Sequence, residues 1–526
     1  MAIFTIPKVA ITLIALYIAR RVYWEATTGA RRRSIAKQNG CLPPRKVPLR
    51  DPIFGLDLLY SNIKAHSDNR LLEAWSDRLK SQERHTVVMP ILGNNIYLTD
   101  DPENIKSMLA TNFNSWSLGR ERIKMMASFL GYGIFCTEGA AWKHSRDMLR
   151  PCFERSQVAD VDMMEKHVKC LIDQIPDDGK TIDLQPLFHH LSMDIATEFL
   201  FGRSTNAQDP NLRDEDVEHF VEAIEYCSDP FSNDNIKRWG FIGAFLPDPK
   251  HAKCAKVLRD FADKYLDAEI ASRSTSTTTT PPKDRYSFLD TLLSATQDRT
   301  TIRSELLNIL LAGRDTTASL LSNLFFELTR HPSKLARLRH EISTHIGSSQ
   351  PTYDTLKQLK YLRAIINETQ RLYPVVPSNS RETLIDTVLP RGGGPTGASP
   401  ILIPKGSFVA YHSYSLQRRK DIYGEDAEEF VPERWMPDEH SSAPLRPGWA
   451  YLAFSGGPRV CIGQNFAITE AGYVVVRLLQ TFGEVESRDE GVWREKLTIT
   501  CIGAGGCKLG LRRELETEGE AVEEKS

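Results

Sequence analysis

Cys461 is the residue whose surroundings most clearly indicate chemistry. It lies in the run Phe454-Ser-Gly-Gly-Pro-Arg-Val-Cys-Ile-Gly463, where glycines at 456, 457 and 463 allow tight turns and let a bulky planar group approach closely. The stretch from Gln464 to Leu479 is predicted to be a helix, so Cys461 is expected just before its N-terminus. Unpaired N–H groups and the helix dipole at that end favour a negatively charged sulfur.

A thiolate in such a loop is suited to bind iron. On haem iron it donates electron density that favours O–O cleavage, and burial and hydrogen bonds tune the potential of the iron. Oxygen activation is therefore the leading hypothesis. The alternative is an unreactive core cysteine in a glycine turn. Phe454, Arg459 and the spacing of the run favour the first interpretation.

A predicted helix from about Ile302 to Arg330 carries a second candidate site. Its apolar sequence is interrupted by the small residues Ala312 and Gly313, which are followed by Asp315 and Thr316. Small residues admit a flat ligand, and the Thr316 hydroxyl can donate to the Ala312 carbonyl, which loosens the helix. An acid and an alcohol at this notch can pass protons to bound dioxygen. Taken alone, the pattern also fits a satisfied hydroxyl beside a solvated aspartate.

Glu368 and Arg371 are expected on one face of a helix that runs from Leu362 to Tyr373. About sixty residues later, the run Phe430-Val-Pro-Glu-Arg-Trp435 supplies a second arginine, Arg434. An exposed pair of this kind contributes little to stability. A buried glutamate with two arginines requires tight geometry, so the trio is predicted to be a structural latch beneath the Cys461 loop.

The run Trp142-Lys-His-Ser-Arg146 places an indole N–H and a guanidinium about one helical turn apart. Both groups are donors that suit a carboxylate on a bound ligand. The alternative is the polar face of an ordinary amphipathic helix.

These four motifs, in this order and at these separations, resemble those of the cytochrome P450 haem-thiolate monooxygenases over roughly residues 45 to 510. The resemblance implies a fold that is mostly α with small β-sheets (α+β), built as a single large catalytic domain. It implies that Cys461 is the axial ligand of haem b, that Asp315 and Thr316 form an acid–alcohol pair, and that the haem also contacts Ala312 and Phe454. Glu368, Arg371 and Arg434 would form the structural triad. The haem propionates would be held by Trp142, Arg146, Arg381 and Arg459.

Several phrases narrow the resemblance to the fungal subgroup that oxidises n-alkanes and fatty acids at or near the chain end. They include Gly133-Ile-Phe-Cys-Thr-Glu-Gly139, Leu389-Pro-Arg-Gly-Gly-Gly394 and Ile422-Tyr-Gly-Glu-Asp426. Tailoring of a polyketide, terpenoid or other fungal secondary metabolite is the alternative. A haem-thiolate isomerase or dehydratase usually lacks the acid–alcohol pair, and a non-catalytic haem-binding protein needs neither proton path nor reductase.

The chain has neither a dinucleotide-binding turn nor a phosphate loop, because Gly392-Gly-Gly-Pro-Thr-Gly397 does not join a strand to a helix. Electrons are therefore expected from another protein. The resemblance implies NADPH-cytochrome P450 reductase, with Lys143, Arg150, Arg418, Arg419 or Lys420 as docking charges. A solvated basic face is the alternative for each of them.

Composition limits the partners and the cellular compartment that are expected for this protein. The 526 residues carry 66 basic and 68 acidic side chains, and a net charge of -2 gives no reason to expect a nucleic acid partner. The nine cysteines contain no CxxC pair, which favours reduced thiols in a protein that faces the cytosol.

Residues 1–24 are predicted to be an N-terminal membrane anchor. An apolar run from Ile3 to Ala19 precedes a basic cluster, an order opposite to that of a cleaved signal peptide. Because the run is short, a helix that lies in the interface is the alternative to a spanning one. The rest divides into a basic, proline-rich linker (25–50), the catalytic domain (51–512) and an acidic tail (513–526). We expect the protein to be located at the endoplasmic reticulum membrane, with the catalytic domain facing the cytoplasm.

Overall fold

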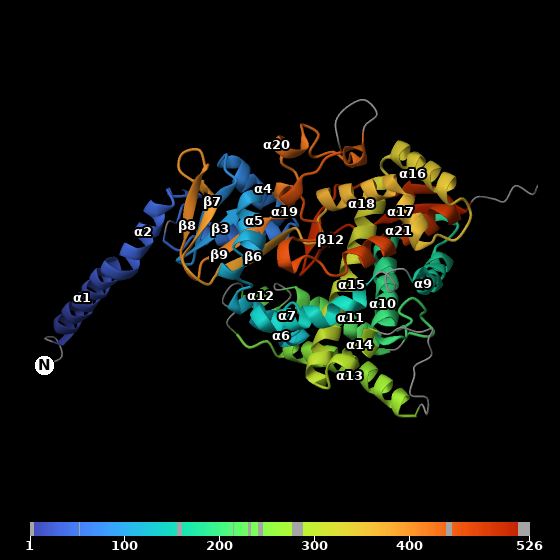
Figure 1. Cartoon of the computed structure of the whole chain (residues 1–526), viewed down its shortest axis with the longest axis horizontal. Helices are drawn as coiled ribbons and strands as arrows, with labels where there is room; N and C mark the ends of the chain where they lie inside the picture. The colour runs from blue at the N-terminus through green and yellow to red at the C-terminus, as the bar shows by residue number, and fades with distance from the viewer. Residues whose placement is uncertain are drawn as a thin grey trace, which may run out of the picture.

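The computed structural model describes residues 5–51, 53–154, 160–213, 215–229, 233–239, 243, 246–275, 288–437 and 444–513. Helices dominate, and the largest sheet lies at one side of the body, near the N-terminal segment (Figure 1). Most of the expected acidic tail lies outside the described residues.

The helices follow one another along the whole chain. They are α1 (Thr5–Trp24), α2 (Ala30–Gln38), α3 (Leu56–Ser67), α4 (Leu71–Ser81), α5 (Pro102–Lys106), α6 (Arg120–Leu130), α7 (Gly139–Leu149), α9 (Val161–Gln174), α10 (Leu184–Phe201), α11 (Glu215–Ser228), α12 (Asp234–Trp239), α13 (Pro249–Thr275), α14 (Phe288–Ala295), α15 (Arg299–Leu328), α16 (Pro332–His345), α17 (Tyr353–Gln358), α18 (Lys360–Leu372), α19 (Ser413–Leu416), α20 (Lys420–Tyr423) and α21 (Gln464–Thr481).

The largest sheet has six strands in the order β1-β2-β3-β9-β6-β4. These strands are β1 (Arg45–Lys46), β2 (Thr86–Ile91), β3 (Asn94–Thr99), β4 (Trp116–Ser117), β6 (Ser378–Thr383) and β9 (Phe408–His412). The remaining strands form smaller sheets: β5 (Asp178–Asp183) with β10 (Phe482–Ser487) and β13 (Lys508–Arg513), β7 (Thr387–Gly393) with β8 (Ser399–Ile403), and β11 (Glu495–Leu497) with β12 (Cys501–Gly503).

Helix α15 runs through the middle of the molecule (Figure 1). Asp298 caps its N-terminus by accepting a hydrogen bond from the Thr300 N–H, and most of its residues are buried. It packs against α10, α13, α18 and α21. Because its leucines and other apolar residues occur on several faces, the helix needs neighbours on several faces, and this explains its central place.

The N-terminal segment is helical beyond the expected end of the anchor. Helix α1 continues through the π-helical turn η2 (Glu25–Gly29) into α2, so residues 25–38 of the expected linker are helical. Among the described residues, no helix combines the length and the apolar character that crossing a membrane requires.

Candidate active site

The Cys461 loop is closed by its own backbone. The Cys461 N–H donates to the Phe454 carbonyl at 3.0 Å, and the Val460 N–H donates to the Gly457 carbonyl at 3.0 Å. Helix α21 begins immediately after this loop, with Gly463 as its N-cap. The sequence prediction for the start of this helix is thus reproduced, and Cys461 lies just before its N-terminus.

Gly457 meets two constraints at once. Its φ is +68°, a conformation that side-chain-bearing residues rarely adopt, and a Cβ there would lie 1.9 Å from the Leu109 carbonyl oxygen. Leu109 belongs to the π-helical turn η3 (Ser107–Thr111), which packs against the Cys461 loop. Only glycine therefore fits at the point where the loop rests on its support.

The Cys461 thiol is recessed rather than on the outer surface. Its residue is exposed, yet desolvation by the surrounding protein raises the pKa of the thiol, while the Gly463 N–H and Arg146 act in the opposite direction. Metal binding at this sulfur would displace the proton, because the thiolate is the ligand form.

Helix α15 contains a notch in the middle of its buried length. Between Ser304 and Thr329, only Ala312, Gly313 and Thr316 are partly exposed. The Thr316 hydroxyl donates to the Ala312 carbonyl at 2.7 Å, as the sequence predicted. The notch therefore presents two small residues and a hydroxyl to an opening inside the protein.

Asp315 is turned away from Thr316. Its carboxylate accepts a hydrogen bond from the Arg314 guanidinium at 2.6 Å and lies 3.8 Å from Nδ1 of His189 on α10. Burial raises the pKa of Asp315, and Arg314 lowers it. Burial also lowers the pKa of His189 to about 3, so this imidazole is neutral at physiological pH. The expected acid and alcohol are neighbours in sequence, but no hydrogen bond joins their side chains.

Two arginines lie over the Trp142 ring, and two more lie close to one of these, Arg459. The guanidinium carbon of Arg459 lies 4.5 Å from the centre of the Trp142 ring, and that of Arg146 lies 5.9 Å from it. Arg381 and Arg122 share an acceptor, because both donate to the Asn379 amide oxygen. Burial and the neighbouring cations Arg381, Arg122 and Arg146 lower the pKa of Arg459 to about 10.

This cluster fits a ligand with two carboxylates, as haem b has. In the part of the chain that the structure describes, none of the four arginines has an ion-pair partner. Their hydrogen bonds go to neutral groups, such as Arg146 to the Val460 carbonyl and Arg459 to the Thr137 carbonyl, and leave these guanidinium groups without a paired carboxylate. Propionates between these arginines would supply the missing negative charge.

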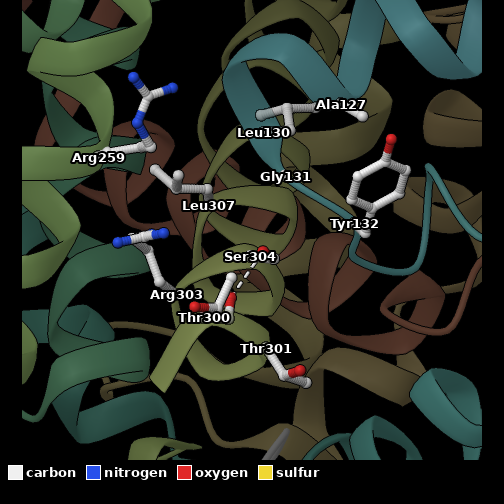
Figure 2. A pocket seen from close by; sticks show the side chains of 10 residues that line it. All are labelled: Ala127, Leu130, Gly131, Tyr132, Arg259, Thr300, Thr301, Arg303, Ser304 and Leu307. Carbon is white, nitrogen blue, oxygen red and sulfur yellow. Dashed lines mark hydrogen bonds between the residues drawn. The ribbon is translucent and has the colours of Figure 1, made fainter. Parts of the chain in front are cut away.

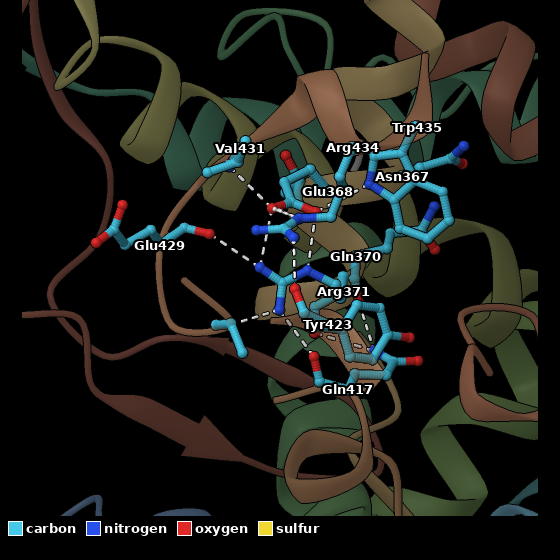
Figure 3. A network of polar contacts seen from close by, with 12 residues as sticks. Asn367, Glu368, Gln370, Arg371, Gln417, Tyr423, Glu429, Val431, Arg434 and Trp435 are labelled. Carbon is cyan, nitrogen blue, oxygen red and sulfur yellow. Dashed lines mark hydrogen bonds and ion pairs between the residues drawn. The ribbon is translucent and has the colours of Figure 1, made fainter. Parts of the chain in front are cut away.

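Glu368 and Arg371 form the centre of a fully buried latch (Figure 3). The two side chains make a bidentate pair at 2.8 and 2.9 Å, and Arg434 donates to the same carboxylate at 2.9 Å. Further donors to Glu368 are the Val431 N–H and the Trp435 indole. The structure thus joins all three residues of the expected triad in one network.

The latch connects to the segment that leads into the Cys461 loop. Arg371 donates to the carbonyls of Gln417, Ala427 and Glu429, which lie along the preceding irregular stretch. Gln417 in turn accepts from the Leu452 N–H at 2.8 Å. Two residues later the chain reaches Phe454, so the latch fixes one end of the loop.

The structure contains two small cavities outside the notch. One, of about 110 Å³, is formed where α6, α13 and the first turns of α15 meet, with Arg259 and Arg303 on one side and Tyr132 on the other (Figure 2). Its lining on α15 extends from Thr300 to Leu307 and includes none of the notch residues. The other, of about 180 Å³, is lined by Trp75, Pro377 and the residues between β11 and β12.

Sequence reasoning missed Arg122 and the pairing of Arg314. Arg122 lies in no motif, and it joins the arginine cluster only because α6 folds against β6. Arg314 is adjacent to Asp315, but adjacent residues on a helix point in different directions, so helix periodicity does not predict that they pair. The only available signal was the presence of a charged residue in an otherwise apolar helix.

A recessed thiol, a hydroxyl-bearing notch in a buried helix and uncompensated arginines around a tryptophan are features of an enzyme that binds haem through sulfur. Comparison with known proteins identifies the family: the cytochrome P450 model matches residues 81–498. The chain therefore belongs to the cytochrome P450 family and is an oxidoreductase of the monooxygenase type. The expected family and enzyme class are confirmed.

Related proteins cover nearly the whole chain. Cytochrome P450 monooxygenase himC of Aspergillus japonicus is 40% identical over 97% of this chain and 90% of its own length. Cytochrome P450 52E1 of Candida apicola is 40% identical over 90% of this chain and 92% of its own length. The crystal structure of cytochrome P450 CYP102L1 superposes with a TM-score of 0.72 at 22% identity, covering 90% of this chain and 99% of that one. The expected fold is thereby confirmed.

Replacing Gly457 with Ala is expected to weaken the Cys461 loop. The new methyl group would meet the Leu109 carbonyl oxygen, and the positive φ of +68° adds a backbone penalty of about 1–2 kcal/mol. Gly406→Ala is the matched control, because Gly406 has a φ of +76° but nothing within 4 Å of its Cβ position. Thermal inactivation of the haem-loaded protein should show a clearly larger loss for Gly457→Ala. Equal losses would mean that contact with Leu109 does not constrain the loop.

Replacing Glu368 with Gln should destabilise the protein by about 3–5 kcal/mol, because two buried guanidinium groups lose their counter-charge. The control is Glu433→Gln, which weakens ion pairs of 3.4 and 3.5 Å to Lys334 and Arg337 at a partly exposed site. That change should cost less than about 1 kcal/mol. Denaturant unfolding of both variants measures the difference, and similar midpoints would contradict the structural role of the latch.

Replacing Arg314 with Gln is expected to move the acidic limb of the pH profile of coupled turnover to higher pH. Without this guanidinium, only burial and the Glu225 carboxylate act on Asp315, and both raise the pKa of its carboxyl further. The measurement is the fraction of consumed oxygen that appears in product. The control is Arg303→Gln. It changes another arginine of α15, which pairs with Asp263 of α13 at 2.8 Å, and should leave the pH profile unchanged. A superimposable profile for Arg314→Gln would exclude control of Asp315 by this pair.

Proposed function

We propose that this enzyme inserts one oxygen atom of O2 into a C–H bond of a lipophilic substrate, a fatty acid or n-alkane oxidised at or near the chain end. The observation that carries the oxygenase part is the notch on α15, where Ala312, Gly313 and Thr316 alone are partly exposed in a buried stretch. The phrases that resemble the fungal n-alkane and fatty-acid hydroxylases support the substrate class.

Haem b would be held by Cys461 through its iron and by Trp142, Arg146, Arg381, Arg459 and Arg122 through its propionates. When bound, this group supplies the oxygen activation and the C–H chemistry. The chain contributes orientation and proton control. Thr316 holds a hydroxyl at the notch, and Asp315 provides the nearest carboxyl, whose protonation depends on Arg314.

Electrons are proposed to come from NADPH through a separate reductase. Lys143 of α7 and Arg150, which follows the last residue of α7, are exposed, and the same helix carries Arg146 close to Cys461. They are the favoured docking charges. The other basic residues that the sequence suggested are already paired within the chain: Arg418 with Glu428, Arg419 with Asp421 and Lys420 with Glu425.

We infer attachment to the endoplasmic reticulum membrane, with the catalytic domain on the cytoplasmic side. Helix α1 presents apolar side chains to solvent along its length, among them Ile11, Leu13, Leu16 and Ile18. The arginines that follow lie where anionic lipid headgroups would attract them.

Tailoring oxidation of a polyketide or terpenoid is the second candidate. Identity to himC and to cytochrome P450 52E1 is the same, 40%, so overall similarity favours neither substrate class.

A ligand panel tests the proposed substrate class. The haem-loaded protein is titrated with dodecanoic acid, hexadecanoic acid, hexadecane, a terpenoid and a polyketide, and binding is measured as a shift of the haem absorbance band. Turnover with reductase and NADPH follows, with products identified by mass spectrometry. A fatty acid or the alkane should bind and yield a product hydroxylated at or near the chain end. Binding and turnover of only the terpenoid or polyketide would overturn the assignment. Cys461→Ser controls for haem ligation.

A further inference from the structure

The N-terminal helix is long and has few contacts with the body. Segments α1, η2 and α2 are 20, 5 and 9 residues long and follow one another without a break in helical backbone. At 1.5 Å per residue this makes a rod of roughly 50 Å. Figure 1 shows α1 projecting from the body, while α2 lies beside β8.

One carboxylate holds this rod. Arg31 and Arg32 contact the two oxygens of Asp386 at 2.6 and 3.0 Å. Among the described residues, these are the only polar side-chain contacts between residues 5–38 and the rest of the chain. The next polar contact is a backbone one, from the Leu42 N–H to the Pro400 carbonyl, and it comes after the helix has ended.

Asp386 is well placed to act as a fixed point. Its side chain is only 3% exposed, and the Lys405 N–H also donates to it at 2.8 Å. Burial raises the pKa of Asp386, but the Lys405 N–H and the two arginines more than offset this, and the pKa falls below its ordinary value. The carboxylate therefore stays charged at physiological pH. Because it contacts two successive residues of one helix, it restrains rotation of the rod as well as its position.

The outer part of the rod is built for lipid. Val9, Ile11, Leu13, Ile14, Leu16, Tyr17, Ile18 and Val22 are each more than half exposed. These side chains point in all directions around the helix, and no other described segment covers them. Arg20 and Arg21 then mark the place where an anionic headgroup layer would meet the helix. The turn before Asp386 adds exposed apolar side chains, Leu384 and Ile385, on the body itself.

We propose that the contact of Arg31 and Arg32 with Asp386 is an orientation lock, which fixes the tilt of the catalytic body on a lipid bilayer bound by α1. This inference rests on the membrane attachment proposed above. Without the lock, α2 would be tied to the body only by its packing on β8 and by the chain after Gln38. The body could then swing on the rod, while α1 would bind lipid as before.

The test uses the full-length, haem-loaded protein in oriented bilayers of phosphatidylcholine and phosphatidylserine. Polarised absorption measures the angle between the haem plane and the bilayer, and co-sedimentation with vesicles of the same lipids measures binding. Asp386→Asn should bind vesicles as the unaltered protein does, but its absorption anisotropy should fall towards the value for random orientation. Glu484→Gln is the matched control, because it weakens an exposed ion pair to Arg512 on a different sheet.

A second variant tests the lock from the other side of the contact, in case the Asp386 variant misfolds. The double change Arg31→Gln and Arg32→Gln alters residues of a helix that has no buried residue, and it should lower the anisotropy equally. Combining both sets of changes should produce no further loss, because they remove the same contact. An unaltered angle in either variant, with binding intact, would overturn the lock. Failure of the unaltered protein to bind vesicles would overturn the bilayer as partner. Neither outcome would affect the oxidation chemistry, which the substrate panel tests separately.

Discussion

The architecture around the thiol depends on a carboxylate that has no access to water. Glu368 is fully buried, and an ionised group in that position is tolerable only with matched donors. Arg371, Arg434, a backbone N–H and an indole provide them. Arg371 also donates hydrogen bonds to backbone carbonyls of the irregular stretch before the Cys461 loop. The need to pair this buried carboxylate fixes the position of the chain around it, because few conformations satisfy so many donors at once.

The arginines around Trp142 present the opposite situation. These cations lower one another's pKa, and in the described part of the chain no carboxylate forms an ion pair with them, although Glu138 acts on Arg459 and Arg122 from farther away. The latch is complete within the protein, whereas the cluster becomes balanced only when an anionic ligand binds. Ligand binding and folding are therefore linked: a group that binds only the folded state stabilises it by mass action. The fold alone fixes the Cys461 loop, whereas the charges of the arginine cluster are balanced only by the bound cofactor.

Residues that sit in compact motifs could be placed from the sequence, because a motif fixes its own local geometry. The Cys461 loop before α21, the Thr316 bond to Ala312 and the Glu368–Arg371 spacing all follow from turns and helix periodicity. Features that depend on which elements meet in space could not be placed. Arg122 reaches Asn379 only through the docking of α6 on β6, and Asp315 turns towards α10 rather than Thr316. The sequence predicts a basic, proline-rich linker over 25–50, whereas residues 25–38 continue the helix of α1.

Helix α15 is prevented from sliding along its axis or rotating about it, and this fixes the position of the notch. Apolar contacts alone would tolerate a helix that slides or rotates, since leucines on all sides can exchange partners. Polar contacts to different layers prevent this. Glu305 accepts from the Ile134 N–H, Thr317 donates to Glu470 of α21, and Ser319 donates to the Cys501 carbonyl of β12. Each involves a buried group that would be left unsatisfied by a shift of one residue. The position of Thr316 is thus determined from both ends of the helix and not by its own hydrogen bond.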